Sequence, residues 1–255
     1  MSEPEVLVSS EAGICHIQIN RPAVKNALNQ AAYQQLASAV TEASHDDAIR
    51  VLLISGTQGN FSSGNDLLDF AAGEGIGGAS ATLAFMKSLL ACEKPVIAAV
   101  SGFAVGIGTT LLLHCDLVYA DNTAVFCLPF NNLGVCAEFA SSLILPRLAG
   151  RAKAMEIILL GETFNAEAAS DLGIICAIEK DVLATAKEKA IKLTRQPPQA
   201  TRLNKSLLRY ESHDTIIQTM EHELEKFTQC LQRAECKEAL TAFQEKRTPD
   251  FSKFK

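Results

Sequence analysis

The chain has 255 residues, of which 48% are hydrophobic and 20% are charged, and its formal net charge is −6. A chain of this size buries a substantial core, and an acidic balance without a block of Lys and Arg argues against nucleic acid or an anionic membrane as a partner. No stretch approaches the about 18 apolar residues of a membrane span, and the N-terminus lacks a basic-then-apolar signal pattern. We therefore expect a globular, cytoplasmic protein whose eight cysteines, without a CxxC pair, are free thiols.

The N-terminal part of the chain predicts a β-hairpin followed by a loop and a helix. Residues 5–9 and 13–20 read as two strands, because Cys15, Ile17 and Ile19 alternate with polar positions in the second of them. After the loop RPAVKN, Asn29 has the character of a helix N-cap. The helix that it begins should run to about residue 44.

Two apolar strands are each followed by a glycine-containing turn. Residues 49–55 lead to FSSGNDL at 61–67, and residues 95–100 lead to GFAVGIG at 102–108, which should open a buried helix. Glycine lets backbone approach closely, and the first turn of a helix leaves N–H groups unpaired. Each turn could thus offer one N–H to the same oxygen, as an acyl oxyanion hole requires. Glycines that only permit close packing are the alternative, whereas the spacing does not fit a nucleotide-binding loop.

The second half of the chain is predicted to be mainly helical. Between the two turns, the segment from residue 70, FAAGEGIGGAS, predicts a mobile loop, and residues 117–120 and 124–128 predict two short strands. After the helices that begin at Arg151, the QPP at residues 196–198 interrupts the pattern. Three amphipathic helices follow, at 200–210, 215–230 and 234–246. Their apolar faces must pack on the core or on another subunit.

The motifs of this chain, taken in order, resemble those of the enoyl-CoA hydratase/isomerase (crotonase) superfamily. The resemblance is carried by INRPAVKNALN, FSSGNDL, GFAVGIG with CDLVYA, LPFNNLG and FQEKR, and it covers nearly the whole chain. It implies an α/β fold, a crotonase-type spiral of repeated ββα units over residues 1–195. A C-terminal helical oligomerisation region over residues 196–255 is implied as well, and with it a homotrimer or a dimer of trimers.

The resemblance also implies how an acyl-CoA substrate would bind. The oxyanion donors would be the backbone N–H groups of Asn65 and Ile107, residues that replace smaller ones common in the family. Further contacts to the CoA thioester are implied for a set of residues in or near the motifs: Lys25, Ser63, Gly64, Asp66, Leu67, Gly106, Phe130 and Lys246. Both lysines could equally be ordinary surface charges, and Asp66 is expected to cap backbone N–H groups. The thioester is the substrate, and neither a metal nor a redox cofactor is needed.

The acid–base residues distinguish members of the superfamily from one another. Family hydratases use two glutamates, and this chain has Thr110 and Phe130 at those two places. Glu138 is a remaining acid at the expected start of an apolar helix, where it could simply be favoured by the helix dipole or could be the catalytic base. PFxxLGxxxExxSS resembles the peroxisomal-type Δ3,Δ2-enoyl-CoA isomerases, in which one glutamate moves the proton. Glu74, in the predicted loop, is a weaker candidate.

This resemblance implies isomerisation of a 3-enoyl-CoA to the 2-trans-enoyl-CoA, a step of the fatty acid β-oxidation type. Two alternatives stay open. Another acyl-CoA enzyme of the superfamily (a hydratase, a thioester hydrolase, or an epoxide or ring isomerase) would keep the oxyanion hole and use a different base. A non-catalytic module would bind CoA without turnover. His114, next to Cys115 and Asp116, is expected to be a packed, hydrogen-bonded histidine rather than a catalyst.

Overall fold

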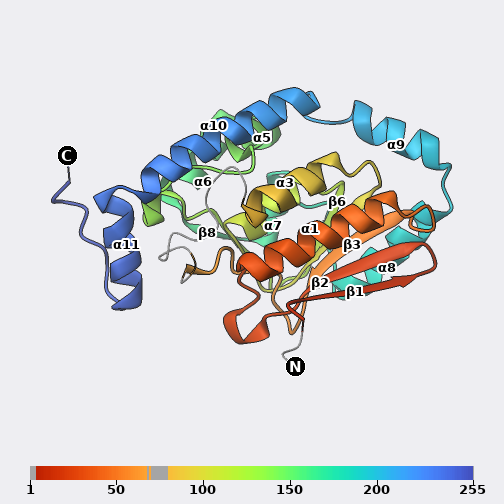
Figure 1. The fold of residues 1–255 in the computed structure, drawn as a ribbon, viewed down its shortest axis with the longest axis horizontal. Helices are drawn as coiled ribbons and strands as arrows, with labels where there is room; N and C mark the ends of the chain where they lie inside the picture. The colour runs from red at the N-terminus through yellow and green to blue at the C-terminus, as the bar shows by residue number, and fades with distance from the viewer. Residues whose placement is uncertain (1–3, 68, 70–79, 255) are drawn as a thin grey trace.

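The structure is a computed structural model that describes residues 4–67, 69 and 80–254 (Figure 1). The predicted loop over residues 70–79, with Glu74, lies outside the described residues. Within the described part, a larger sheet orders its strands β1 (Val6–Glu11), β2 (Ile14–Ile19), β3 (Val51–Gly56), β4 (Val96–Val100), β6 (Leu117–Ala120) and β9 (Ala177–Ile178). The predicted hairpin is confirmed, since β1 and β2 pair antiparallel, and every other neighbouring pair in this sheet is parallel. The turns after β3 and β4 therefore leave the sheet at the same edge.

A second, smaller sheet fixes the position of the turn after β4. It consists of β5 (Phe103–Val105), parallel to β7 (Val125–Cys127), which pairs antiparallel with β8 (Thr163–Asn165). The sequence analysis missed β5 and β8, and it expected residues 102–108 to form a glycine turn between β4 and a buried helix, without a strand in it. Gly102 has a φ of +57°, and a Cβ there would lie 2.2 Å from the carbonyl oxygen of Gly59. The chain can turn from the larger sheet into the smaller one only because this residue is glycine.

Both faces of the larger sheet are covered by helices. On one face lie α1 (Gln30–His45) and α3 (Ala81–Ala91), which run side by side (Figure 1). On the other lies α8 (Val182–Thr194). Because both faces are covered, alternate residues of β3 belong to two separate apolar clusters. A strand buried on both sides reads as a continuous apolar run. The predicted cap of α1 is confirmed, since the Asn29 side chain accepts a 2.8 Å hydrogen bond from the Ala32 amide.

The remaining helices form the rest of the core and the C-terminal part. They are α4 (Ile107–Thr110), α5 (Ser141–Ala149), α6 (Arg151–Leu160), α7 (Ala166–Asp171), α9 (Pro198–Leu207), α10 (His213–Leu231) and α11 (Ala234–Gln244), with 3-10 turns η1 (Pro22–Val24), η2 (Leu111–His114) and η3 (Asn131–Leu133). Helix α10 runs along the upper edge of the view in Figure 1 and buries Ile216, Met220 and Phe227 against the core. Helix α9 buries no residue. None of the described helices has the length and apolarity that a membrane span needs.

Candidate active site

The two glycine turns are hydrogen-bonded to each other at the edge of the larger sheet. The Ser62 amide donates to the Phe103 carbonyl oxygen at 2.7 Å, and the Val105 amide donates back to the Ser62 carbonyl oxygen at 2.9 Å. Gly64 has a φ of +93°, and a Cβ there would lie 2.6 Å from the Val105 carbonyl oxygen. A Cβ on Gly108 would lie equally close, 2.6 Å, to the Ser62 carbonyl oxygen. Both glycines are therefore needed for the close approach of the two turns.

In each turn, the residue that is predicted to be an oxyanion donor has a backbone N–H group that pairs with no described acceptor. The amides of Leu28 and Asp66 donate across a short parallel bridge on either side of Asn65, whose own N–H pairs with no acceptor in the described chain. Ile107 is the first residue of α4, where N–H groups have no partner within the helix, and its N–H likewise pairs with no described acceptor. Two neighbouring turns that each offer a free N–H group meet one requirement of an oxyanion hole, and the assignment of these two donors stays a prediction.

A groove and a cavity meet beside Asn65. The groove is lined by nine of the ten sequence-predicted residues other than Glu138, namely Lys25, Ser63, Gly64, Asn65, Asp66, Leu67, Gly106, Ile107 and Phe130. The cavity is lined by side chains from α1, α3 and α10, by parts of the connecting segments and by Glu138. Asn65, Asp66 and Phe227 line both. A ligand in the groove could therefore extend past Asn65 toward Glu138.

Glu138 is a buried carboxyl group, with 8% of its surface exposed. The Thr110 hydroxyl donates a hydrogen bond to its Oε1 atom. Burial is the main reason why the pKa of Glu138 rises to about 8; the hydrogen bond from Thr110 opposes this shift, and the nearby Glu223 carboxylate adds to it. A group with such a pKa can both accept and release a proton near neutral pH. Thr110, at one of the two places where the resemblance implies a glutamate in family hydratases, thus donates a hydrogen bond to the candidate base.

The predicted position of Glu138 in the first turn of a helix is wrong. Helix α5 begins at Ser141, and before it Phe139 and Ala140 both have a φ of +55°, which is a left-handed conformation. The reading of Glu138 as a side chain stabilised by the helix dipole therefore fails. The start of α5 is instead occupied by Glu223 of α10, which accepts hydrogen bonds from the amides of Ala140 and Ser142 at 2.6 and 3.0 Å.

Sequence reasoning missed Glu223, although the sequence carries a signal for it. In α10 the residues that are buried are Ile216, Met220, Glu223 and Phe227, which recur at helical spacing. An acid on the apolar stripe of an amphipathic helix needs a buried partner. The position could thus have been marked as unusual, but its partners lie 81 and 83 residues earlier in the chain.

Tyr33 is a second residue that the sequence analysis did not identify. It is 1% exposed on α1, lines the cavity, and donates a 2.5 Å hydrogen bond to the Asn65 side-chain oxygen. The Asn65 side chain, in the first glycine turn, is thereby fixed from α1. Tyr33 had no local signal, because an aromatic residue on the buried face of a helix is ordinary core composition.

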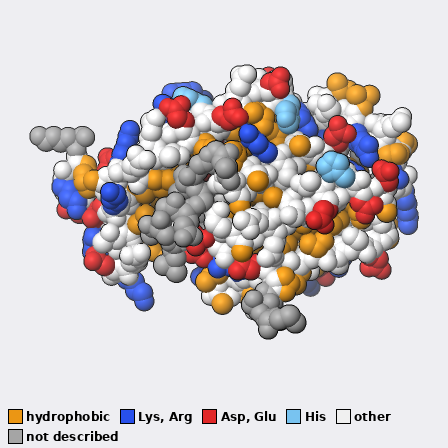
Figure 2. All heavy atoms as spheres, viewed as in Figure 1, with side chains coloured by type: hydrophobic (Ala, Val, Ile, Leu, Met, Phe, Trp, Pro, Cys, Tyr) orange, Lys and Arg blue, Asp and Glu red, His pale blue; other side chains and the backbone are white. Residues whose placement is uncertain are grey.

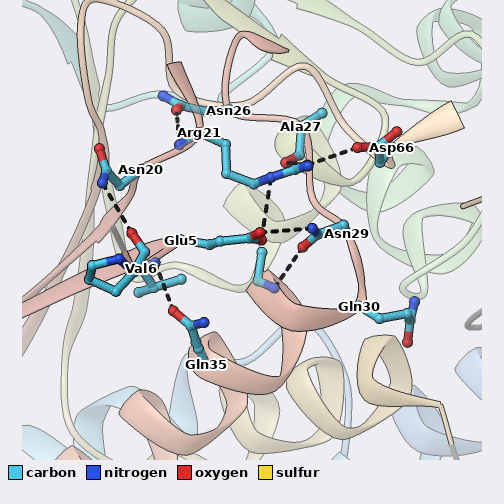
Figure 3. Close-up of polar contacts among 12 residues, drawn as sticks. Glu5, Val6, Asn20, Arg21, Asn26, Ala27, Asn29, Gln30, Gln35 and Asp66 are labelled. Carbon is cyan, nitrogen blue, oxygen red and sulfur yellow. Dashed lines mark hydrogen bonds and ion pairs between the residues drawn. The ribbon is translucent and has the colours of Figure 1, made fainter. Parts of the chain in front are cut away.

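Asp66 is held by an ion pair that connects the first glycine turn to the N-terminal loop (Figure 3). Arg21 Nη1 lies 2.9 Å from Asp66 Oδ2 and donates to the Ala27 carbonyl oxygen at 2.6 Å, and its Nε lies 3.3 Å from Glu5 Oε2. Figure 3 shows the guanidinium group between these acceptors. Because Asp66 is next to Asn65, this ion pair helps to fix the direction of the predicted backbone donor.

The basic residues and the histidine differ in how well they fit their predicted roles. His114 is packed as expected, since its Nε2 donates to the Phe139 carbonyl oxygen at 2.7 Å and burial lowers its pKa to about 4. Lys25 lines the groove, with its Nζ 4.4 Å from the centre of the Phe103 ring. Lys246 is exposed just after α11 and is not among the groove-lining residues described in this chain. Its predicted contact with CoA stays a prediction for an assembled form.

Comparisons with known proteins agree with this geometry. The family model for enoyl-CoA hydratase/isomerase matches residues 9–254. The chain is 34% identical to enoyl-CoA delta isomerase 2 of Rattus norvegicus over 93% of its length, and it spans 63% of that relative. It is 33% identical to 2,3-dehydroadipyl-CoA hydratase of Escherichia coli over 97% of its length and 98% of the relative's.

The fold agrees with a solved structure as well. The crystal structure of an enoyl-CoA hydratase/isomerase from Pseudoalteromonas atlantica matches with a TM-score of 0.92 and 36% identity, covering 97% of this chain and 99% of the other. The predicted crotonase-type fold is thus confirmed. The relatives include both isomerases and hydratases, so likeness alone gives a class of acyl-CoA enzyme and not one reaction. The chain belongs to the enoyl-CoA hydratase/isomerase family.

Proposed function

We propose that this protein isomerises 3-enoyl-CoA to 2-trans-enoyl-CoA with Glu138 as its only acid–base residue. The observation that carries the proposal is which side chains stand at positions 110, 130 and 138, because these side chains decide the acid–base chemistry. Glu138 is buried beside the cavity, Thr110 donates a hydrogen bond to it, and Phe130 is a buried side chain in the wall of the groove. Adding water to a double bond takes both an acid and a base, and neither Thr110 nor Phe130 can serve as the second carboxyl group.

The proposed reaction moves one proton between two carbon atoms. Glu138, as the carboxylate, takes a proton from C2, which the thioester makes acidic. The electron pair shifts onto the thioester oxygen, and the N–H groups of Asn65 and Ile107 stabilise the resulting dienolate. Protonated Glu138 then gives the proton to C4, and the double bond ends between C2 and C3. Thr110 occupies only Oε1, and Oε2 accepts from none of the described residues, which leaves it for the substrate.

The rate of isomerisation should depend on pH through Glu138. Burial raises the pKa of this carboxyl group to about 8, and the reaction needs the carboxylate, so kcat/KM should rise as pH increases and level off above about pH 8. The measurement is kcat/KM for 3-hexenoyl-CoA across the pH range in which the protein stays folded. A rate that is independent of pH from the acidic side upward would contradict this account of the base.

A trimer or a dimer of trimers is the proposed assembly. Leu203, Leu207 and Leu208, on α9 and at its end, are 61%, 70% and 82% exposed in the single chain, and hydrophobic side chains reach the surface over α9 at the right of the view in Figure 2. A second subunit would cover them. Leu207→Lys should therefore lower the molar mass measured by light scattering. Gln229→Lys, which adds the same charge at an exposed site of α10, is the control and should not. Particles of monomer mass from the unsubstituted protein would rule out the assembly.

A further inference from the structure

The carboxylate of Glu223 holds the backbone turn that carries Glu138. Its Oε2 accepts from the Ala140 amide at 2.6 Å, and its Oε1 accepts from the Ser142 amide at 3.0 Å and the Ser142 hydroxyl at 2.5 Å. The Glu138 carbonyl oxygen, at the other side of the turn, accepts from the Ser141 amide and hydroxyl at 3.0 and 2.6 Å. Glu223 is only 5% exposed, so these bonds are made in a nearly water-free place.

The turn needs such an anchor because its backbone is strained. Phe139 and Ala140 are both left-handed at a φ of +55°, a conformation that costs free energy for residues other than glycine. Two such residues in succession persist only where the surroundings fix them. Two external side chains do so here, since Glu223 binds the Ala140 amide and His114 binds the Phe139 carbonyl oxygen.

The hydrogen-bonding pattern selects the ionised form of Glu223. All the groups that contact its two oxygens are donors, and a protonated carboxyl group would have to donate to one of them. Burial raises the pKa of Glu223, but the bonds from Ser142 and Ala140 and the neighbouring His222 oppose that shift. Cys136, in the loop before Glu138, also faces it, and its thiol donates to the Glu223 carbonyl oxygen at 3.7 Å.

Glu138 therefore lies near a second negative charge. The groups that act on it are the Thr110 hydroxyl, Tyr33 from α1 and Glu223 from α10. A like charge favours the protonated form of a carboxyl group, and burial acts in the same direction. The C-terminal helix α10 thus contributes both to the position of Glu138 and to the readiness with which it takes up a proton.

We infer that Glu223 is a positioning residue for the proton transfer, acting through Glu138 by anchoring the 138–142 turn and by placing a carboxylate nearby. This inference rests on the proposed function for its catalytic consequence. The anchoring of the 138–142 turn by Glu223 does not depend on which acyl-CoA the enzyme converts. Glu223 lies 85 positions after Glu138, on a helix for which the sequence predicted a role in assembly.

Two substitutions separate the anchoring effect from the charge effect. Glu223→Gln keeps the length of the side chain but removes the charge, and its amide nitrogen cannot accept from the turn. Glu223→Asp keeps the charge but is too short to reach the Ala140 and Ser142 amides together. Glu221→Gln makes the same chemical change two residues away, at an exposed site that forms an ion pair with Lys87 at the surface. It is the matched control.

Each variant is measured in two ways, by kcat and KM for 3-hexenoyl-CoA and by the pKa of Glu138. The pKa comes from the carbon-13 carboxyl resonance in glutamate-labelled protein, which Glu138→Gln assigns. We expect Glu223→Gln and Glu223→Asp to lower kcat by roughly 10-fold or more with little change in KM, because a misplaced base loses its alignment with C2. Only Glu223→Gln should lower the pKa of Glu138, by roughly half a unit or more, and should move the acid limb of the pH profile to lower pH.

Each outcome either supports or contradicts the positioning role of Glu223. If both variants keep the kcat and the Glu138 pKa of Glu221→Gln, Glu223 does not position the base. If Glu223→Gln does not fold, Glu223→Asp is the test. A lower kcat with an unchanged Glu138 pKa then supports the anchoring role of Glu223, and an unchanged kcat contradicts it. If the unsubstituted protein does not convert 3-hexenoyl-CoA at all, the proposed function fails, and the carboxyl titration still tests the coupling between Glu223 and Glu138. A loss of kcat in Glu223→Gln without any change in the Glu138 pKa would contradict the charge effect.

Discussion

Replacing Glu138 by glutamine is expected to lower kcat for 3-hexenoyl-CoA by about 10²- to 10⁴-fold, the usual contribution of general acid–base catalysis. Glutamine keeps the size of the side chain and an oxygen that can accept from Thr110, but it has no lone pair basic enough to take a proton from C2. Because the groove beside Asn65 is unchanged, the affinity for the CoA thioester should stay close to that of the parent. Steady-state kinetics and a direct binding measurement check both parts.

The alternative base to exclude is Glu74, which lies outside the described residues. Glu74→Gln is therefore the comparison variant, and it should isomerise the substrate at nearly the parent rate. If Glu138→Gln is the active variant and Glu74→Gln the inactive one, the base is in that segment and the assignment to Glu138 is wrong.

Replacing Gly64 by alanine should lower kcat by about 10²- to 10³-fold, the effect that removal of one oxyanion donor has in other enzymes. A Cβ at this position would lie 2.6 Å from the Val105 carbonyl oxygen, and the backbone φ of +93° is unfavourable for alanine. The turn must move away from β5, and the Asn65 N–H then no longer points to the thioester oxygen. The measurement is kcat at saturating 3-hexenoyl-CoA, with circular dichroism to confirm the fold.

Gly59→Ala is the matched control for this substitution. Gly59 also has a positive φ, +74°, but a Cβ there would meet nothing within 4 Å. Gly59→Ala therefore introduces a comparable backbone strain without pushing the two turns apart. Asn65→Ala, which keeps the backbone donor and removes the bond from Tyr33, should likewise retain much of the activity. A loss in Asn65→Ala as large as in Gly64→Ala would show that the side chain, and not the main chain, is the important donor.

Local sequence signals predicted much of the fold. Asn29 marked the start of α1 because a cap is a local interaction, and the apolar runs at β3 and β4 marked strands, which the structure shows to be buried and parallel. The two strands that were missed, β5 and β8, have three residues each, which is too short for an alternating pattern to be visible. Their existence depends on pairing with β7, a contact that no local pattern shows.

The candidate site was predictable where it follows a motif and not where it depends on distant contacts. The last five residues of FSSGNDL and the first two of GIG line the groove as the resemblance implied. The turn before α5 was mistaken for helix because Ala140 and Ser141 are ordinary helix residues, and the left-handed turn depends on Glu223 and His114 from elsewhere in the chain. Tyr33 and Glu223 act on Asn65 and Glu138 across tertiary contacts, so only the structure places them in the site.

The central claim is that a single buried carboxyl group makes this family member an isomerase. The most direct test follows the ultraviolet absorbance of the conjugated 2-enoyl thioester while the purified protein acts on two substrates in parallel. With 3-hexenoyl-CoA the absorbance should increase, because the double bond moves into conjugation, and with crotonyl-CoA it should stay constant. A loss of absorbance with crotonyl-CoA and no increase with 3-hexenoyl-CoA would show that the protein is a hydratase and that the account of Glu138 is wrong.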